Sequence, residues 1–332
     1  MKLVDSHNRR IDYLRISITD HCNLNCLYCA PLRGRTRLAH EDILTYEEIQ
    51  KVIEAAVSSG ISKIRITGGE PLVRKDMVDL CRELSKVRGL QDISVTTNGV
   101  MLSELAGPLF EAGVKRVNVS LDTFQPERFK KIAGHDLLPR VFAGIKKAEE
   151  VGMHPIKINT VVMRDVNEDE VRDLARLTLR KPYHVRFIEV MPTKGCALGI
   201  PASLFVAVDE ILKMVKRVGP LSIEKVAHSF GPARLCSLPG ALGKVGFIAP
   251  LSWHFCDSCN RLRLTADGKL RTCLFSEKEI DIRGPLREGA SREELGDIFK
   301  MAVNLKPAGH QLKKSDVRIP KNLGRTMQAI GG

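Results

Sequence analysis

The chain of 332 residues is poor in aromatic side chains and has no long apolar run. Aromatic residues make up 5% of it, and the basic residues are scattered instead of forming a Lys/Arg block. This composition argues against a protein that stacks single-stranded nucleic acid on aromatic rings. No run has the length of a membrane span, and the N-terminus lacks the apolar core of a secretory signal. We therefore expect a cytoplasmic protein.

The composition that is present is that of a globular protein. Hydrophobic residues make up 43% of the chain and charged residues 27%, which favours a folded chain with a sizeable core. The formal net charge of +13 admits nucleic acid, an anionic membrane surface or a phosphorylated small substrate as partner. Charge alone does not choose among them.

Short β-branched runs recur along the first two thirds of the chain and predict six strands. They cover residues 14–19, 63–69, 93–99, 116–122, 156–162 and 185–191. Helical patterns lie between them, with predicted capping boxes at Thr45/Glu48 and Asn167/Glu170. Strands that alternate with helices pair in parallel through right-handed crossovers. Six units are fewer than the eight of a closed barrel, so the predicted fold class is α/β, a partial (β/α)6 TIM-like barrel.

The last third of the chain has a different pattern. Its segments LSIEKV and KVGFIAP are typical of strands, RLRLTADGKLRTCL predicts a hairpin that turns at Asp267-Gly268, and a Ser291/Glu294 capping box precedes a helix. We expect residues 1–215 to form the barrel and residues 216–332 to form a C-terminal α+β module that covers its open side.

Six of the nine cysteines fall into two groups of three. A reducing compartment argues against disulfides, so clustered thiols indicate metal ligands. The first trio is Cys22, Cys26 and Cys29, and the second is Cys256, Cys259 and Cys273. The remaining three, which have no close partners and receive no function, are Cys81, Cys196 and Cys236.

Three thiolates on one loop suit a 4Fe–4S cluster with one iron left open. Such a cluster has four corners and is held by cysteine thiolates. The first trio follows the first predicted strand, at the carboxyl end of the sheet, where α/β folds bind ligands. Zinc is the alternative, with His21 as fourth ligand of the first trio or His254 as fourth ligand of the second.

Cationic residues lie within the predicted strands, where a charge is costly. Parallel strands are normally buried on both faces and nearly all apolar. This set nevertheless carries Arg15, Lys63, Arg65, Lys157 and Arg186. An unpaired buried cation costs several kcal/mol, and Glu189 is the main acidic candidate on these strands. A polyphosphate inside the barrel is therefore the predicted partner, unless the side chains reach past the strand ends into solvent.

The spacing C-x3-C-x2-C with Tyr28 before the last cysteine, and the turn Gly68-Gly69-Glu70-Pro71 after the second strand, resemble the radical S-adenosylmethionine (SAM) superfamily. The resemblance implies that SAM binds the open iron of the first cluster. The reduced cluster then cleaves SAM to a 5′-deoxyadenosyl radical, which abstracts a hydrogen from the substrate, while the protein supplies position and excludes solvent.

The segment FCDSCNRLRLTADGKLRTCLF, the strand VRFIEVMP, the GPAR segment and Gly331-Gly332 resemble the GTP 3′,8-cyclase family of molybdenum cofactor biosynthesis. The resemblance spans essentially the whole chain. It implies a lyase with a second 4Fe–4S cluster that contacts the guanine of GTP. Abstraction of the ribose 3′ hydrogen and closure onto C8 give (8S)-3′,8-cyclo-7,8-dihydroguanosine 5′-triphosphate.

The resemblance also implies residue roles. The implied GTP-binding residues are Arg15, Arg65, Thr96, Lys157, Arg261 and Arg263. Those implied for SAM are Tyr28, Gly69, Ser120 and Met191. The catalytic set is Cys22, Cys26, Cys29, Gly331 and Gly332, of which the two glycines reach into the active site.

The expected partners are GTP as substrate, a small flavin or iron–sulfur electron donor, and cyclic pyranopterin monophosphate synthase downstream. With this resemblance we expect neither nucleic acid nor a membrane as partner. The oligomeric state stays open, with a homodimer as the candidate. Two other functions stay open at this stage. One is a radical SAM peptide maturase with an auxiliary cluster. The other is a zinc-dependent nucleic-acid-binding protein, whose binding would depend steeply on salt.

Overall fold

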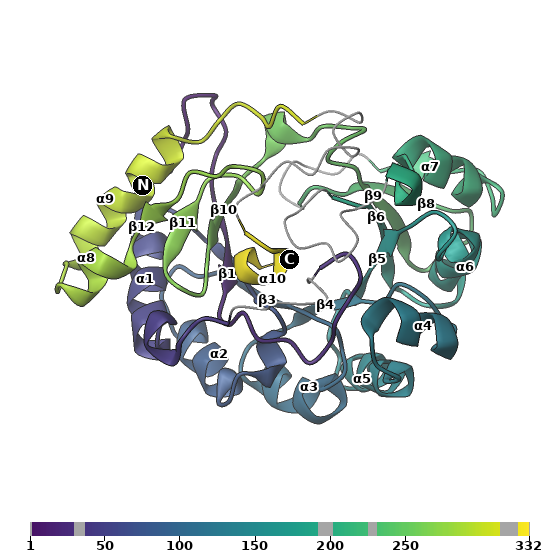
Figure 1. Ribbon diagram of the computed structural model, residues 1–332, viewed down its shortest axis with the longest axis horizontal. Helices are drawn as coiled ribbons and strands as arrows, with labels where there is room; N and C mark the ends of the chain where they lie inside the picture. The colour runs from purple at the N-terminus through teal and green to yellow at the C-terminus, as the bar shows by residue number, and fades with distance from the viewer. Residues whose placement is uncertain (1, 30–36, 192–201, 225–230, 313–324, 332) are drawn as a thin grey trace.

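The computed structural model describes residues 2–29, 37–191, 202–224, 231–312 and 325–331. Strands form an inner curved wall, and the helices that connect them lie outside it (Figure 1). The barrel strands are β1 (Tyr13–Ser17), β2 (Lys63–Thr67), β3 (Asp92–Thr97), β4 (Arg116–Ser120), β5 (Lys157–Val162) and β6 (His184–Glu189). The predicted partial (β/α)6 barrel is confirmed.

The connecting helices follow the order expected for repeated strand–helix units. They are α1 (Tyr46–Ser59), α2 (Met77–Ser85), α3 (Leu102–Glu111), α4 (Pro126–Ala133), α5 (Leu138–Glu150), α6 (Val171–Arg180) and α7 (Val208–Lys216). Short 3-10 turns are η1 (His40–Asp42), η2 (Pro71–Val73), η3 (Glu168–Glu170), η4 (Ala202–Leu204) and η5 (Cys256–Ser258). The later elements are β7 (Ser222–Ile223), β8 (Arg234–Ser237), β9 (Lys244–Ile248), β10 (Arg261–Leu264), β11 (Lys269–Arg271), β12 (Ile280–Asp281), α8 (Arg283–Arg287), α9 (Arg292–Asn304) and α10 (Met327–Ile330).

The C-terminal strands extend the barrel at both edges. The described strands form one sheet in the order β12-β11-β10-β1-β2-β3-β4-β5-β6-β9-β8-β7. Strand β10 pairs in parallel with β1, and β9 pairs in parallel with β6. The barrel stays open between β9 and β10, and α10 lies in the middle of the ring in Figure 1. The hairpin at Asp267-Gly268 is confirmed, since β10 and β11 are antiparallel. The domain boundary near residue 215 stays a prediction.

Side chains along the barrel strands alternate between an apolar outer face and a polar inner face. Leu14 and Ile16 of β1 are fully buried, as are Ile64 and Ile66 of β2. The intervening positions carry polar groups, and the register sets Arg15 directly between Arg65 and Arg263. The barrel thus departs from the usual parallel sheet with two apolar faces, as the cations within the predicted strands indicated. Its inner face lines a cavity, so only the outer face packs against helices.

Two of the three predicted capping boxes are confirmed. Thr45 with Glu48 caps α1, and Ser291 with Glu294 caps α9. The box predicted at Asn167/Glu170 is wrong. Asn167 accepts from the amide of Met163 and donates to two backbone carbonyls, while Glu170 accepts from the amide of Phe124 at 2.7 Å. These side chains brace loops instead of capping a helix.

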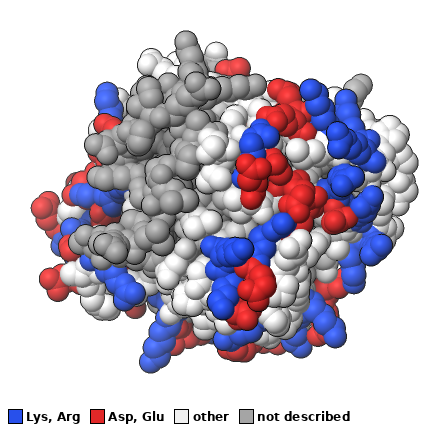
Figure 2. All heavy atoms as spheres, turned by 45° about the vertical axis from the view of Figure 1, so that its right-hand side comes forward, with Lys and Arg blue, Asp and Glu red and all other residues white. Residues whose placement is uncertain are grey.

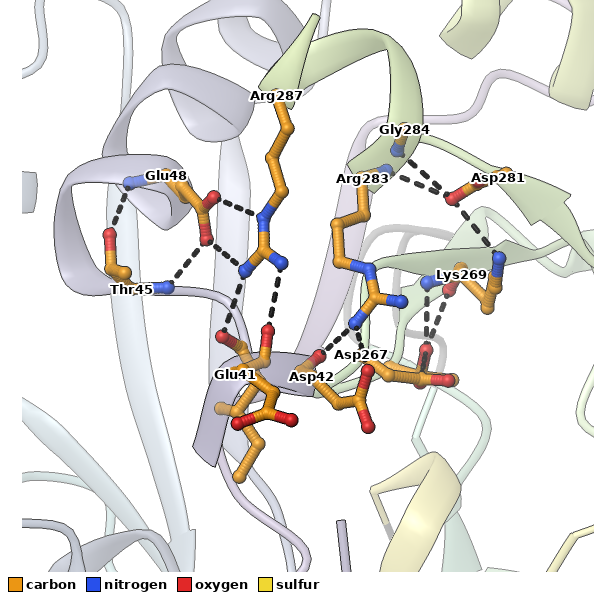
Figure 3. A network of polar contacts seen from close by, with 12 residues as sticks. Glu41, Asp42, Thr45, Glu48, Asp267, Lys269, Asp281, Arg283, Gly284 and Arg287 are labelled. Carbon is orange, nitrogen blue, oxygen red and sulfur yellow. Dashed lines mark hydrogen bonds and ion pairs between the residues drawn. The ribbon is translucent and has the colours of Figure 1, made fainter. Parts of the chain in front are cut away.

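The C-terminal module is fastened to the beginning of the barrel (Figure 3). Arg283 of α8 donates to the backbone and carboxylate oxygens of Asp42, and Arg287 forms an ion pair with Glu48 at 2.7 Å. Exposed pairs of this kind contribute about 0–1 kcal/mol each. The larger contribution comes from α9, whose Leu295 and Phe299 are buried in the main core.

Charges of both signs are interspersed on the described part of the face in Figure 2. Pairs such as Arg128 with Asp169 and Arg164 with Glu210 keep basic side chains next to acidic ones. Neither of these pairs belongs to a stripe of a single sign. Among the described helices, no segment has the length and apolar character needed to cross a bilayer.

Candidate active site

A large cavity inside the barrel brings together most of the predicted site residues. Its volume is about 270 Å³. Both cysteine trios line it: Cys22, Cys26, Cys29, Cys256, Cys259 and Cys273. So do the residues implied for SAM, which are Tyr28, Gly69, Ser120 and Met191. Of those implied for GTP, the lining includes Arg15, Arg65, Thr96, Arg261 and Arg263. Two groups of thiols that are far apart in sequence therefore face one space.

The loop of the first trio is fixed by backbone hydrogen bonds. Its amides at Asn25 and Leu27 donate to the carbonyls of Ala133 and Ile132 at the end of α4, at 2.8 and 2.9 Å. The hydroxyl of Tyr28 donates to Asp122 at 2.7 Å. Burial raises the pKa of Asp122 to about 6, and it raises the pKa of Tyr28 well above its usual value. The aromatic ring of the motif is thus oriented by a buried carboxyl that follows β4.

The glycines of the Gly68-Gly69-Glu70-Pro71 turn touch the first cysteine loop. A Cβ at Gly69 would lie 2.3 Å from the carbonyl oxygen of His21, and one at Gly68 would lie 2.6 Å from that of Thr19. The amides of Gly69 and Glu70 donate to these two carbonyls, each at 2.7 Å. The close approach that the glycines allow is therefore first of all an approach to the cysteine loop.

Glu70 joins the ends of β2 and β3 behind the first trio. Its carboxylate accepts from the hydroxyl of Thr97 at 2.7 Å and from the amides of Asn98 at 2.6 Å and Leu72 at 3.1 Å. Burial raises its pKa to about 7 against the effect of these hydrogen bonds. The side chain of Asn98 donates in turn to Asn23 at 2.7 Å. Glu70 therefore positions the residue next to Cys22.

In the second trio, Cys256 lies in η5, Cys259 lies between η5 and β10, and Cys273 follows the end of β11. The amide of Cys259 donates to the carbonyl of Cys256 at 3.0 Å. Burial would raise the pKa of Cys259, but the charges of Arg261 and Lys306 lower it to about 6. A thiol with a lowered pKa is readily available as a thiolate ligand.

The segment KPAGH, residues 306–310, packs against the second trio. The sequence analysis did not identify it. The buried ammonium of Lys306 donates to the carbonyls of Arg261 at 2.9 Å and Thr272 at 2.6 Å, next to two of the ligand positions. A Cβ at Gly309 would lie 3.3 Å from the sulfur of Cys256. Arg9 donates to the carbonyls of Cys256 and Ala308, both at 2.8 Å. Only the cysteine spacing signalled this pocket in the sequence.

His254 and His310 lie beside the second trio. Their ligating atoms and the sulfur of Cys256 all lie within 4.8 Å of one another, and the two rings are 4.5 Å apart. The zinc alternative needed His254 together with all three cysteines. The group that comes together contains neither Cys259 nor Cys273.

Arginines dominate the electrostatics of the cavity. Burial, together with the charges of Arg263 and Arg65, lowers the pKa of Arg15 well below its usual value. Burial lowers the pKa of Arg263 and of Arg186 to about 9, helped by Arg261 in the first case and Arg65 in the second. The buried Nε of Arg186 has no hydrogen-bond partner. Mutual repulsion of this kind is relieved by a bound polyanion.

Glu189, the main acidic candidate on the strands, is used by the backbone. It accepts from the backbone amides of Val208, Leu251 and Ser252, at 2.9 to 3.1 Å. It therefore stabilises a loop junction, which agrees with the argument that acidic partners for the strand cations are few. Lys63 does have a carboxylate, Asp12, at 3.3 Å.

Two implied site residues that the structure describes, Lys157 and Gly331, do not line the cavity directly. Lys157 is 6% exposed and sits opposite Asn118 of β4. Burial and the charges of Arg186 and Arg65 lower its pKa to about 6. Gly331 accepts a hydrogen bond from Arg263 at 2.8 Å through its carbonyl. Gly332 lies outside the described residues, as does Cys196, while Cys81 and Cys236 are buried as expected for unassigned cysteines.

The structure adds Asn159 and Arg186 to the polar lining of the cavity. They sit opposite each other on β5 and β6, and the Oδ1 atom of Asn159 is buried without a hydrogen-bond partner. The sequence already indicated Arg186, because it is a charged residue within a predicted strand. Asn159 is an ordinary polar residue in a strand, and no pattern distinguished it.

The chain matches two protein families along most of its length. The Radical SAM superfamily matches residues 16–178, and the family Molybdenum Cofactor Synthesis C matches residues 183–312. The GTP 3′,8-cyclase of Moorella thermoacetica is 49% identical over 328 residues, which is 99% of both chains. That of Peptoclostridium acidaminophilum is 48% identical and covers 99% of this chain and 98% of the relative.

Among solved structures, SuiB of Streptococcus suis bound to S-adenosylmethionine superimposes with a TM-score of 0.61. The alignment covers 88% of this chain and 69% of SuiB at 15% identity. A likeness at this identity concerns the fold, and it agrees with the partial barrel described above.

Proposed function

The chain belongs to the GTP 3′,8-cyclase family within the radical SAM superfamily, and on this premise we propose that it converts GTP to (8S)-3′,8-cyclo-7,8-dihydroguanosine 5′-triphosphate. It is a radical SAM lyase of molybdenum cofactor biosynthesis. The observation that carries the proposal is that both cysteine trios and a set of arginines line one cavity. That arrangement lets a radical made at one end reach a nucleotide held at the other.

The cofactors are two 4Fe–4S clusters and SAM, and the donor residues suit them. Each trio offers three thiol groups on the cavity wall, next to segments braced by Glu70 or Lys306. We assign the first cluster to Cys22, Cys26 and Cys29. The second is assigned to Cys256, Cys259 and Cys273. With three protein ligands, each cluster keeps one iron for SAM or for the purine.

We assign triphosphate binding to the cations on the inner face of the barrel. Arg15, Arg65 and Arg263 stand side by side in register on neighbouring strands. Their forked guanidinium groups match phosphate oxygens. Arg261, Thr96 and Lys157 complete the proposed GTP set. The triphosphate brings negative charge next to these clustered cations, which favours the nucleotide over an uncharged peptide segment.

SAM is assigned to the half of the cavity next to the first trio. Tyr28, Gly69, Ser120 and Met191 line that half in the proposal. Cys22, Cys26 and Cys29 would hold the first cluster, which together with SAM would supply the radical chemistry for removal of the ribose 3′ hydrogen of GTP. The residues of this chain hold both molecules in position and keep solvent away from them.

We extend the proposal to location and partners. The protein would act in the cytoplasm, receive electrons from a small flavin or iron–sulfur carrier, and pass its product to cyclic pyranopterin monophosphate synthase. A homodimer is the proposed assembly. The supporting arguments are the unbridged thiols, which need a reducing compartment, and the family itself.

The test is anaerobic incubation of the reconstituted, reduced protein with SAM, with or without GTP. We expect 5′-deoxyadenosine and the cyclised nucleotide to appear together, and only when GTP is present. Metal analysis of the same sample should give about eight irons with matching sulfide per chain, the content of two 4Fe–4S clusters.

Two outcomes would redirect the assignment. Formation of 5′-deoxyadenosine with a peptide substrate but not with GTP would favour the maturase alternative. Zinc without sulfide, combined with salt-dependent binding to nucleic acid, would favour the nucleic-acid alternative.

A further inference from the structure

The segment Arg325–Gly331 is fastened to the C-terminal module by one guanidinium. Arg325 donates through two nitrogens to the two oxygens of Asp267, at 2.9 and 2.8 Å. The second nitrogen also reaches Glu279 at 2.7 Å. A forked contact with one carboxylate and a further contact with another fix both position and angle. The side chain of Arg325 is 21% exposed, so the contact is partly shielded from solvent.

Asp267 lies in a turn whose position is fixed by backbone hydrogen bonds. In this β10–β11 turn, the amide of Leu44 donates to the carbonyl of Ala266 at 2.9 Å. The carbonyl of Gly268 accepts from Ile282 at 3.0 Å, and a Cβ at Gly268 would lie 2.6 Å from Arg283. Next to this turn, α8 is joined to Asp42 through Arg283 and to Glu48 through Arg287 (Figure 3).

Glu279 faces two arginines at once. One oxygen binds Arg325, and the other forms an ion pair with Arg271. The side chain of Arg271 is 1% exposed, and its guanidinium also donates to the carbonyls of Leu274 and Ser276. These carbonyls belong to the loop that begins at Cys273, so Arg271 holds the loop of the third ligand in the second trio.

The other end of the segment forms part of the cavity wall. Thr326 caps α10, and Met327 lines the cavity. The carbonyl of Gly331 accepts a hydrogen bond from Arg263. The backbone φ of Gly331 is 72°, and a Cβ at this position would lie 2.7 Å from the side chain of Thr67. Only glycine therefore fits at this position. The position of the segment therefore bears on Arg263, a residue of the proposed nucleotide site.

We propose that Glu279 couples the loop of Cys273 to the docking of residues 325–331, with Arg325 as the positioning residue for Gly331. The carbonyls of Leu274 and Ser276 in the Cys273 loop hold Arg271 against one oxygen of Glu279, which keeps the other oxygen in place for Arg325. Coupling between two sites is reciprocal, so release of the segment loosens the loop. The inference relies on the proposed function only for assigning Cys273 to the second cluster.

Hydrogen exchange of the reconstituted protein, without GTP or SAM, tests the coupling. Arg325→Gln removes the charged contact and should raise the exchange rate of amides 327–331 at least tenfold. It should also raise that of amides 274–279 at least threefold, with iron content unchanged. Arg325→Lys keeps a positive charge and should restore part of the protection in both places.

The matched control is Arg292→Gln, which removes an ion pair between α9 and Glu54 outside the site. It should change neither segment. Glu279→Gln keeps the shape of the side chain and should loosen both segments.

Three results would overturn the inference. They are faster exchange in 327–331 alone after Arg325→Gln, no change in either segment, or loosening of the loop but not of 327–331 after Glu279→Gln. Because the side chain of Arg325 is partly exposed, we expect its variants to fold. They therefore still test the coupling if Glu279→Gln fails to fold. Because no turnover is measured, failure here is separate from failure of the proposed cyclase activity.

Discussion

Single residues in the barrel interior carry charge where a packed core would carry none. Arg15, Arg65 and Arg263 are neighbours on three strands, and Lys157 and Arg186 lie further round the ring. Burial and mutual repulsion lower the pKa of Arg15, Arg186, Arg263 and Lys157. A bound anion stabilises the charged form of these side chains. Their contribution to affinity should therefore appear in the pH dependence of GTP binding.

Lys157 should take up a proton when GTP binds. Its pKa of about 6 makes it mostly neutral at pH 8, and a nearby phosphate favours the charged form. Its contribution to affinity therefore increases as the pH falls from 8 toward 6, by up to about tenfold per pH unit. Calorimetry at pH 8 in two buffers of different ionisation enthalpy should show the uptake in the wild type and not in Lys157→Met. Equal uptake in both proteins would assign the proton to another group.

Gly331→Ala should lower cyclisation at least tenfold while leaving the iron content unchanged. The new methyl would lie 2.7 Å from Thr67, and the residue has a φ of 72°, a region that costs an L-residue about 1–2 kcal/mol. Gly289→Ala is the matched control, because its φ of 92° is also positive but no atom lies within 4 Å. Turnover and iron are measured in the same preparations. Turnover within twofold of the wild type in Gly331→Ala would show that the backbone there is not needed.

At the scale of elements, the turn after β2 and the loop after β1 form one unit. The contacts of Gly68 and Gly69 are with backbone atoms of Thr19 and His21, which cannot move away as a flexible side chain could. The first trio therefore depends on a turn roughly forty residues further along the chain.

Gly69→Ala should displace the first cysteine loop. A methyl 2.3 Å from the carbonyl of His21 pushes on the residue before Cys22, so we expect loss of about half of the iron, the share of one of two clusters. Gly107→Ala adds a methyl where nothing lies within 4 Å, and it should keep all of the iron. Full iron content and normal SAM cleavage in Gly69→Ala would contradict the structural role given to this turn.

The elements also show what the sequence could predict. β-branched runs and the cysteine spacing predicted all six barrel strands and both trios, since strand propensity and ligand spacing are local properties. The parallel joining of β10 to β1 and of β9 to β6 was not predictable, because no local pattern states which edge a later strand will join. Asn167 and Glu170 matched a capping pattern, but tertiary hydrogen bonds used both side chains elsewhere.

At the scale of the whole molecule, one sheet joins the two halves of the sequence. The first trio follows β1, and the second flanks the β10–β11 hairpin that lies directly beside β1. Both trios line one cavity because β1 and β10 are adjacent strands, although the trios are far apart in the sequence. The account therefore requires that the molecule cleaved at the first trio and the nucleotide held by the arginines meet within that space.

Transfer of deuterium from GTP labelled at the ribose 3′ position into 5′-deoxyadenosine tests this requirement most directly. Mass spectrometry of a reconstituted, anaerobic reaction should find one deuterium in the 5′-deoxyadenosine, in step with loss of GTP. Unlabelled 5′-deoxyadenosine that still forms only when GTP is present would contradict the shared cavity as the place of reaction.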